Sequence, residues 1–214
     1  DLAIKSLKFN FLPKNIFSVE KEEILETNLF NQKLPNPIGL AAGFDKSAEV
    51  YNSLFKLGYG FVEVGTITPR RQLGNPKPRI FRLEKDQALI NRLGFNNHGS
   101  EIVSKRIANN LPTGFLGINI GPNKDSLNKE EDYFLCLSRL SSLAGYITIN
   151  ISSPNTEGLR DFHKKEELEK LLNGINKIKK DKNISKDIVV KLSPDINDND
   201  INKIIEIIIK HKIS

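Results

Sequence analysis

The sequence predicts an α/β fold: a (β/α)8 TIM barrel, here truncated to about five βα units and preceded by a partial N-terminal helical extension. Five short runs of β-branched and apolar residues each precede an amphipathic helical pattern, and this alternation requires parallel strands joined by right-handed crossovers. Every predicted strand also ends in polar residues. A barrel brings all of its loops to one site, whereas a small open sheet, the alternative, would concentrate polar residues at a single switch point.

The five units can be followed from residue 37 onward. The predicted strands cover residues 38–42, 61–68, 115–121, 146–151 and 188–192. The predicted helices cover about 47–57, 100–111, a segment around 134–140, about 165–179 and about 200–210. The last helix is expected to turn five isoleucines toward the core: Ile201, Ile204, Ile205, Ile208 and Ile209. The second unit is interrupted by an irregular segment at 69–78, an excursion strand at 79–83 and a polar, glycine-bearing stretch at 89–99.

Two domains are expected. Residues 1–30 would form an incomplete N-terminal helical extension, with one helix within 1–12 stopped by Pro13 and a second within 19–25. Residues 31–214 would form the barrel domain without its C-terminal units. Residues 30–37 would lead into it as a connector or a small strand. Residues 212–214 indicate the approach to a sixth strand.

The composition is that of an ordinary globular protein, with 214 residues, 38% hydrophobic and 27% charged. The net charge is +6, but the lysines are scattered and form no basic stripe interleaved with aromatic residues, so a nucleic-acid partner is not expected. The single cysteine, Cys136, excludes an internal disulfide and lies in an apolar helical pattern typical of the core. No apolar run approaches the ~20 residues of a membrane span.

The fourth predicted strand carries the strongest chemical signal. Its apolar run ends at Asn150-Ile151-Ser152-Ser153-Pro154-Asn155, where Pro154 cannot continue a central strand. The simpler interpretation is a turn that joins a strand to a helix. However, four hydrogen-bonding side chains within six positions lie at the end of a strand where α/β barrels place their chemistry.

The complete set of strand ends narrows the chemistry. It contains glycines, amides, hydroxyls and two lysines, and this composition argues against a metal site and against a Ser-His-Asp triad. The three histidines, His98, His163 and His211, are expected on the surface. Lys46 alone could be a surface lysine that starts a helix, whereas Lys191 is expected to be buried because it lies inside a strand. Such a set suits a flat heteroaromatic ring with an anionic substrate beside it.

Six motifs, in this order along the chain, resemble those of dihydroorotate dehydrogenases. They are AAGFDK (41–46), EVGTITPR (63–70), NPKPRIFRL (75–83), INRLGFNN (90–97), GINIG (117–121) and NISSPNTEGLR (150–160). The chain resembles the membrane-associated, quinone-dependent class 2 in having Ser153 where soluble members use cysteine, and in its helical segment ahead of the barrel.

The resemblance implies an FMN enzyme, a quinone-dependent oxidoreductase of the EC 1.3.5.2 type, that oxidises (S)-dihydroorotate to orotate in de novo pyrimidine biosynthesis. Ser153 would be the catalytic base. The implied FMN contacts are Ala42, Gly43, Phe44, Asp45, Lys46, Thr66, Asn119, Asn150 and Lys191. The implied substrate contacts are Lys46, Asn91, Arg92, Leu93, Gly94, Phe95, Asn150 and Asn155. Lys46 would meet the orotate carboxylate, Lys191 would stabilise the anionic reduced ring, and Arg82 would face the quinone tunnel.

The resemblance also implies a peripheral protein at the cytoplasmic face of a bacterial inner membrane, with the mitochondrial inner membrane as the alternative. Its partners would be dihydroorotate, orotate and a membrane quinone, and no metal is expected. Two other functions stay open at this point. One is a different flavin-dependent oxidoreductase acting on a dihydropyrimidine or dihydrouridine. The other, supported only by the positive charge, is a non-catalytic basic barrel that binds RNA.

Overall fold

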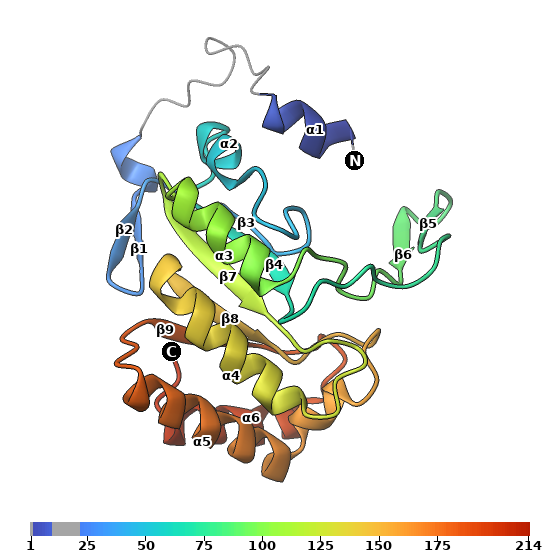
Figure 1. Ribbon diagram of the computed structural model, residues 1–214, viewed down its shortest axis with the longest axis vertical. Helices are drawn as coiled ribbons and strands as arrows, with labels where there is room; N and C mark the ends of the chain where they lie inside the picture. The colour runs from blue at the N-terminus through green and yellow to red at the C-terminus, as the bar shows by residue number, and fades with distance from the viewer. Residues whose placement is uncertain (1, 10–21) are drawn as a thin grey trace.

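The computed structural model describes residues 2–9 and 22–214, and its centre is a five-stranded parallel sheet (Figure 1). The strands are β3 (Gly39–Leu40), β4 (Phe61–Ile67), β7 (Phe115–Ile120), β8 (Tyr146–Asn150) and β9 (Asp187–Lys191). Their order in the sheet is β3-β4-β7-β8-β9, and all four pairings are parallel. Each strand therefore lies beside the one before it in the sequence, with no reversal of order. This is the order of a βα-barrel and differs from that of a doubly wound open sheet.

The helices that connect the strands pack together on one side of this sheet. They are α2 (Tyr51–Lys56), α3 (Ser100–Asn109), α4 (Lys129–Leu140), α5 (Lys165–Asp181) and α6 (Asp198–Lys210). Figure 1 shows α3, α4 and α5 lying side by side along the sheet, and neighbouring pairs are in contact. Right-handed crossovers between successive strands put all helices on the same face. The core between the two layers includes Cys136, which is fully buried as predicted.

The predicted buried face of the last helix is partly wrong. Ile204 and Ile207 are buried, whereas Ile205 and Ile209 are 44% and 69% exposed. The isoleucines fill so many consecutive positions of α6 that they mark no single stripe, so their pattern alone does not define the face that packs against α5.

The N-terminal region adds a short helix and a hairpin to the barrel. Helix α1 (Leu2–Lys8) buries Leu7, and the Ser53 hydroxyl of α2 donates to the Leu7 carbonyl at 3.0 Å. The rest of the first predicted helix, at 10–12, and residues 19–21 of the second lie outside the described residues. A 3-10 helix (η1, Glu23–Leu25) follows, and then an antiparallel hairpin of β1 (Thr27–Leu29) and β2 (Gln32–Leu34). Of the two possibilities for 30–37, a connector or a small strand, the structure has the strand, β2.

A second hairpin, β5 (Ile80–Leu83) and β6 (Ala88–Asn91), projects away from the sheet (Figure 1). The sequence predicted β5 but not β6: Leu89 and Ile90 are apolar, but they begin a stretch, 89–99, that is otherwise rich in Asn and Gly and was expected to be irregular. At the opposite edge, the Ser214 N–H donates to the Ile188 carbonyl of β9 at 3.0 Å, as expected for the approach to a further strand. Within the part of the chain that the structure describes, no helix is both long and apolar enough to cross a membrane.

Candidate active site

The carboxyl ends of β4, β7 and β8 bring three predicted site residues into direct contact. Thr66, Asn119 and Asn150 are all buried. The Thr66 hydroxyl donates to Asn119 Oδ1 at 2.7 Å, and Asn150 Nδ2 donates to Thr66 Oγ1 at 2.9 Å and to Asn119 Oδ1 at 3.1 Å. The parallel register places the ends of these strands at one edge of the sheet, so residues far apart in the sequence form one polar cluster.

The cluster continues through Ser152 to Lys191. Both the N–H and the hydroxyl of Ser152 donate to Asn150 Oδ1, at 3.1 and 2.8 Å, and Lys191 Nζ donates to Ser152 Oγ at 3.0 Å. The prediction that Lys191 is buried is wrong. Lys191 is exposed because it is the last residue of β9, the outermost strand of the sheet, so its ammonium group keeps contact with solvent.

The loop after β8 is held in place on both sides of Ser153. Ser153 is half-buried, and its hydroxyl accepts from the Asn155 N–H at 3.2 Å. Tyr133 Oη of α4 donates to the Asn150 carbonyl at 2.6 Å, at the point where the strand ends. Arg160 Nε donates to the Ser152 carbonyl at 3.4 Å, and the Arg160 guanidinium also pairs with the Asp195 carboxylate in the loop after β9.

The loop after β3 is tied to β4 by its backbone. The Gly43 N–H donates to the Gly65 carbonyl at 2.9 Å, and the Gly65 N–H donates to the Asp45 carbonyl at 3.0 Å. Gly65 has φ +120°, and a Cβ there would collide with the Asn119 carbonyl. Glycine is therefore required where β4 and β7 approach each other most closely.

Asp45 and Lys46 differ in what their side chains can bind. The buried Asp45 carboxylate accepts from the N–H groups of Glu49 and Val50, each at 2.8 Å, so it is used by the turn that precedes α2. Burial raises the pKa of Asp45 above its usual value, against the effect of these N–H groups. The Lys46 ammonium contacts the Gly43 carbonyl. Burial and the nearby Arg79 charge lower the pKa of Lys46. Phe44 is 43% exposed, and Ala42 is half-buried.

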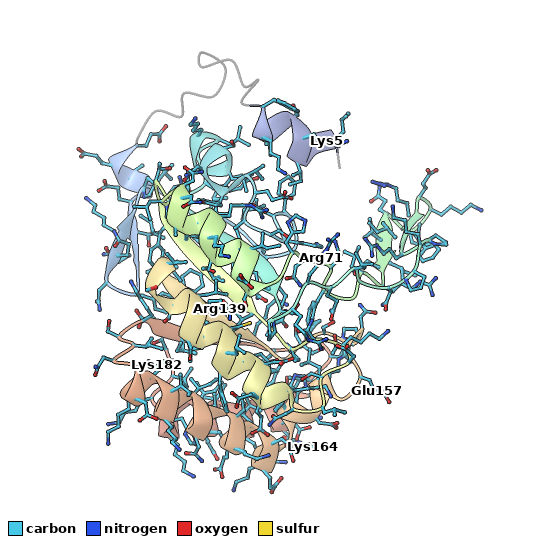
Figure 2. The ribbon with its side chains drawn as sticks, in the orientation of Figure 1. Lys5, Arg71, Arg139, Glu157, Lys164 and Lys182 are labelled. Atoms are coloured by element: carbon cyan, nitrogen blue, oxygen red, sulfur yellow. The ribbon has the colours of Figure 1, made fainter. Side chains whose placement is uncertain are left out.

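Lys46 also lines a cavity of about 1060 Å3 between α1, the β3 loop and the segment that precedes β5. Its wall is rich in cations: Lys5, Lys8, Lys46, Arg71, Lys77 and Arg79. Figure 2 labels Lys5, on α1, and Arg71, on the facing loop. Arg82, predicted to face the quinone tunnel, lies on β5 and is exposed, whereas its neighbours Arg79 and Ile80 line the cavity.

The predicted substrate segment 91–95 lies at the base of the β5–β6 hairpin. Asn91 and Arg92 are exposed, and the Arg92 guanidinium donates to the Pro78 carbonyl at 2.9 and 3.1 Å, so it holds the hairpin closed. Leu93 lines the cavity. Gly94 is buried, and the Phe95 ring approaches the loop after β7, where a Cβ on Gly121 would lie 3.2 Å from it.

Three residues that connect these loops were not predicted as site residues. Asn97 Nδ2 donates to Thr68 Oγ1 at 2.8 Å, and Asn123 Nδ2 donates to the same oxygen at 3.2 Å and to Gln72 Oε1 at 3.2 Å. Asn97, Thr68 and Asn123 are buried. The available signal was their position, since Asn97 and Thr68 lie inside two of the six motifs and Asn123 lies two residues after a third. The structure shows that they join the loops after β4, β6 and β7.

Glu63 was also missed, although it lies in the middle of an apolar strand. Its carboxylate accepts from Asn119 Nδ2 at 2.9 Å, from Tyr146 Oη at 3.0 Å and from Thr148 Oγ1 at 2.8 Å. Burial, together with this carboxylate, raises the pKa of Tyr146. A carboxylate inside a core strand needs partners of this kind, and that requirement was the signal in the sequence.

The prediction that all histidines lie on the surface is wrong for His211, which is 7% exposed. It directly follows the last residue of α6 and lies seven positions after the buried Ile204, two helical turns further along, so it continues the buried face of that helix. His98 and His163 are half-buried. Among residues 2–9 and 22–214, no group of three or more His, Cys, Asp or Glu side chains is placed to hold a metal ion.

Together, the sheet order and the polar strand ends define a βα-barrel protein whose candidate binding site lies at the carboxyl ends of its strands. Comparison with known proteins gives the family: the chain belongs to the dihydroorotate dehydrogenase family, whose sequence profile matches residues 24–214.

Individual relatives agree with this assignment. The chain is 46% identical over 186 residues to a protein of Bartonella tribocorum named dihydroorotate dehydrogenase (quinone), covering 85% of this chain and 52% of the relative. It is 46% identical over 209 residues to the protein of that name from Bartonella henselae, covering 96% and 57%. The chain therefore spans about half the length of the curated relatives that it matches.

A solved structure supports the fold. The crystal structure of a DHODH from Eimeria tenella in complex with ferulenol superimposes with a TM-score of 0.91 at 35% identity, covering 100% of this chain and 63% of that one. The predicted barrel is thereby confirmed as the fold of this family.

Proposed function

We propose that the protein oxidises (S)-dihydroorotate to orotate with FMN and passes the electrons to a quinone, in de novo pyrimidine biosynthesis. The observation that carries this proposal is the continuous polar cluster from Thr66 through Asn119, Asn150 and Ser152 to Lys191. It lies at the strand ends of a chain that belongs to the dihydroorotate dehydrogenase family. The relatives named as quinone enzymes support the choice of electron acceptor.

The residues present fit the ring of FMN. Neutral amides and hydroxyls can read the polar edge of a flavin, and the Lys191 ammonium group, which donates one hydrogen bond to Ser152, has two further N–H groups to offer. At Gly43 (φ +114°) a Cβ would meet only Lys46 Nζ, at 3.7 Å, so the β3 loop leaves open space beside its backbone. The proposed FMN contacts are Ala42, Gly43, Phe44, Lys46, Thr66, Asn119, Asn150 and Lys191. Asp45 would contribute through its backbone, since its carboxylate is used by the turn.

Each reacting group of the substrate has a proposed partner. Lys46 would bind the carboxylate of dihydroorotate, and Asn91 to Phe95, Asn150 and Asn155 would surround the pyrimidine. FMN, when bound, accepts the hydride that leaves C6. Ser153 Oγ would take the proton from C5, so that the two hydrogens leave as a hydride and a proton. Because a serine hydroxyl is a weak base, Ser153 must pass its own proton to a second acceptor as it takes the one from C5.

The quinone would approach through the cavity between α1 and the β3 loop, and Arg82 would act at its outer side on the hairpin. Residues 1–30 would form the helical extension that docks on the membrane and residues 31–214 the FMN-binding domain. Helix α1 supports this arrangement, because Leu2 is 85% exposed and Lys5 and Lys8 lie on the same helix. The protein would be peripheral, at the cytoplasmic face of a bacterial inner membrane or, as the alternative, at the mitochondrial inner membrane.

Anaerobic mixing of the purified protein with dihydroorotate tests the proposal. We expect bleaching of the flavin absorbance in the wild type and a large slowing in Ser153→Ala, with bound FMN unchanged. Ser152→Ala is a poor control because Ser152 contacts Asn150 and Lys191; Ser126→Ala, on an exposed loop, is a suitable one. Bound flavin that dihydroorotate does not bleach would contradict the proposal and favour a different dihydropyrimidine substrate.

A further inference from the structure

We propose that Glu63 is a positioning residue that orients the side-chain amide of Asn119 and, through it, the hydrogen bonds of Thr66 and Asn150, and thereby the amide groups that the site presents. This inference rests on the proposed function only for its link to FMN. The hydrogen-bond order itself is a property of the chain alone.

Glu63 can act in this way because it only accepts. Its carboxylate is on β4, and the groups that face it come from β7 and β8: Asn119 Nδ2, Tyr146 Oη and Thr148 Oγ1, at 2.9, 3.0 and 2.8 Å. Gly117 makes the arrangement possible, since a side chain at that position would collide with the Tyr146 ring. With an acceptor on this side, the amide of Asn119 must turn its nitrogen toward Glu63.

The orientation of Asn119 then determines the next two groups. Its oxygen points toward Thr66 and Asn150, so the Thr66 hydroxyl must donate to it, at 2.7 Å. The Thr66 oxygen is left as an acceptor, and Asn150 donates to it at 2.9 Å. Asn150 must therefore turn its nitrogen inward and its oxygen outward.

The outer half of the cluster follows from the same rule. The Asn150 oxygen accepts from the Ser152 hydroxyl at 2.8 Å and from the Ser152 N–H, which can only donate, at 3.1 Å, so the loop after β8 supports the same orientation of Asn150. Ser152 Oγ in turn accepts from Lys191 Nζ at 3.0 Å. Lys191 can only donate, so the cluster runs from an acceptor-only group to a donor-only group. An amide in isolation could face either way, because its oxygen and nitrogen have nearly the same shape. Here the two ends agree on a single order.

The consequence for the site is chemical. Asn119 and Asn150 are each held in one orientation, although Asn150 has no contact with Glu63. Replacing Glu63 by a residue that cannot accept releases Asn119, and a reversed Asn119 would put its own donor, Nδ2, against the donor Asn150 Nδ2. We therefore expect a change at Glu63 to be detectable at Asn150.

The test compares Glu63→Leu, which removes the acceptor, with Glu63→Gln, which still offers an oxygen to Asn119. Tyr146→Phe is the matched control, since it removes one bond to Glu63 and leaves the Asn119 bond intact. The first measurement is the side-chain amide NMR signals of Asn119 and Asn150 in protein labelled with 15N-asparagine, without FMN. We expect both to move in Glu63→Leu and to stay near their wild-type positions in Glu63→Gln and Tyr146→Phe.

Two results would overturn the inference: Asn150 signals that do not move in Glu63→Leu, or Asn150 signals that move in Glu63→Gln. If Glu63→Leu does not fold, the Asn150 signals of Glu63→Gln decide alone. The second measurement is FMN affinity by fluorescence quenching, for which we expect Glu63→Leu to bind about tenfold more weakly than Glu63→Gln. Equal affinities would contradict the link to the cofactor. Failure of the wild type to bleach with dihydroorotate would count against the proposed function alone, because the NMR result needs neither substrate nor flavin.

Discussion

Removing the Tyr133 hydroxyl tests how the barrel holds the end of its central strand. Tyr133 is fully buried in α4, and its hydroxyl donates to the Asn150 carbonyl at 2.6 Å. In Tyr133→Phe the ring still packs against Phe162, 5.9 Å away between centroids, but the buried carbonyl loses this donor. Leaving a buried acceptor unsatisfied costs about 1–2 kcal/mol in the free energy of unfolding.

Urea denaturation followed by circular dichroism measures this cost directly. We also expect the melting temperature to fall by roughly 2–8 °C for a chain of this size. Burial raises the pKa of Tyr133 well above its usual value, so its hydroxyl remains a donor at alkaline pH. The stability difference between wild type and variant should therefore stay constant between roughly pH 6 and pH 9.

Tyr51→Phe is the matched control. Tyr51 is also buried, and its hydroxyl also donates to a backbone carbonyl, but that carbonyl belongs to the exposed Asn110. Water can replace the lost donor there, so we expect a cost below about 0.5 kcal/mol. The reasoning is refuted if both substitutions destabilise the protein equally, or if Tyr133→Phe changes stability by less than the control.

Three further predictions concern other parts of the structure. Gly65→Ala should lower the free energy of unfolding, measured by urea denaturation, by more than about 1 kcal/mol and by more than Gly43→Ala. Both glycines have positive φ, but only at Gly65 would the new Cβ meet the Asn119 carbonyl. Equal losses in the two variants would show that this contact is unimportant. Burial raises the pKa of Cys136, so a thiol reagent at about pH 8 should label no cysteine in the native protein and one after unfolding, and rapid native labelling would contradict the structure. Because the pKa of Lys46 is lowered, the affinity for orotate should begin to fall at a lower pH than it would with a lysine of ordinary pKa. Titration calorimetry should show about 10–100-fold weaker binding in Lys46→Ala, and in Lys46→Arg an affinity that does not fall over this pH range. A pH dependence in Lys46→Arg equal to that of the wild type would exclude this role.

The strands and helices that define the barrel were predictable from the sequence because each has a clear hydrophobic period and ends at polar or turn-forming residues. The strand at 61–67 and the helix at 165–181 lie within two residues of their predicted bounds. Strand β6 was not predicted, because its residues begin a stretch rich in Asn and Gly and none of them is buried; β5 is equally exposed and was predicted from its run of apolar residues alone. In α6 the isoleucines were too numerous to mark one face, so both the exposure of Ile205 and the burial of His211 went unseen.

The candidate site was predictable as a set of strand ends but not as a network. That Asn150 and Lys191 share a level of the sheet follows from the register between β8 and β9, which the sequence does not state. The exposure of Lys191 depends on its place on the outermost strand, and the role of Glu63 depends on which residues of β7 and β8 face it. Such relations between strands arise only when the sheet is formed.

The unreversed strand order has a consequence for the way the molecule is built. Each strand of the sheet pairs with the strand that precedes it in the sheet, so one crossover segment closes at every step, and no strand has to wait for a partner from a later unit. A ribosome releasing this chain from the N-terminus could therefore deliver the sheet one unit at a time, with every arriving strand meeting a neighbour that is already in place.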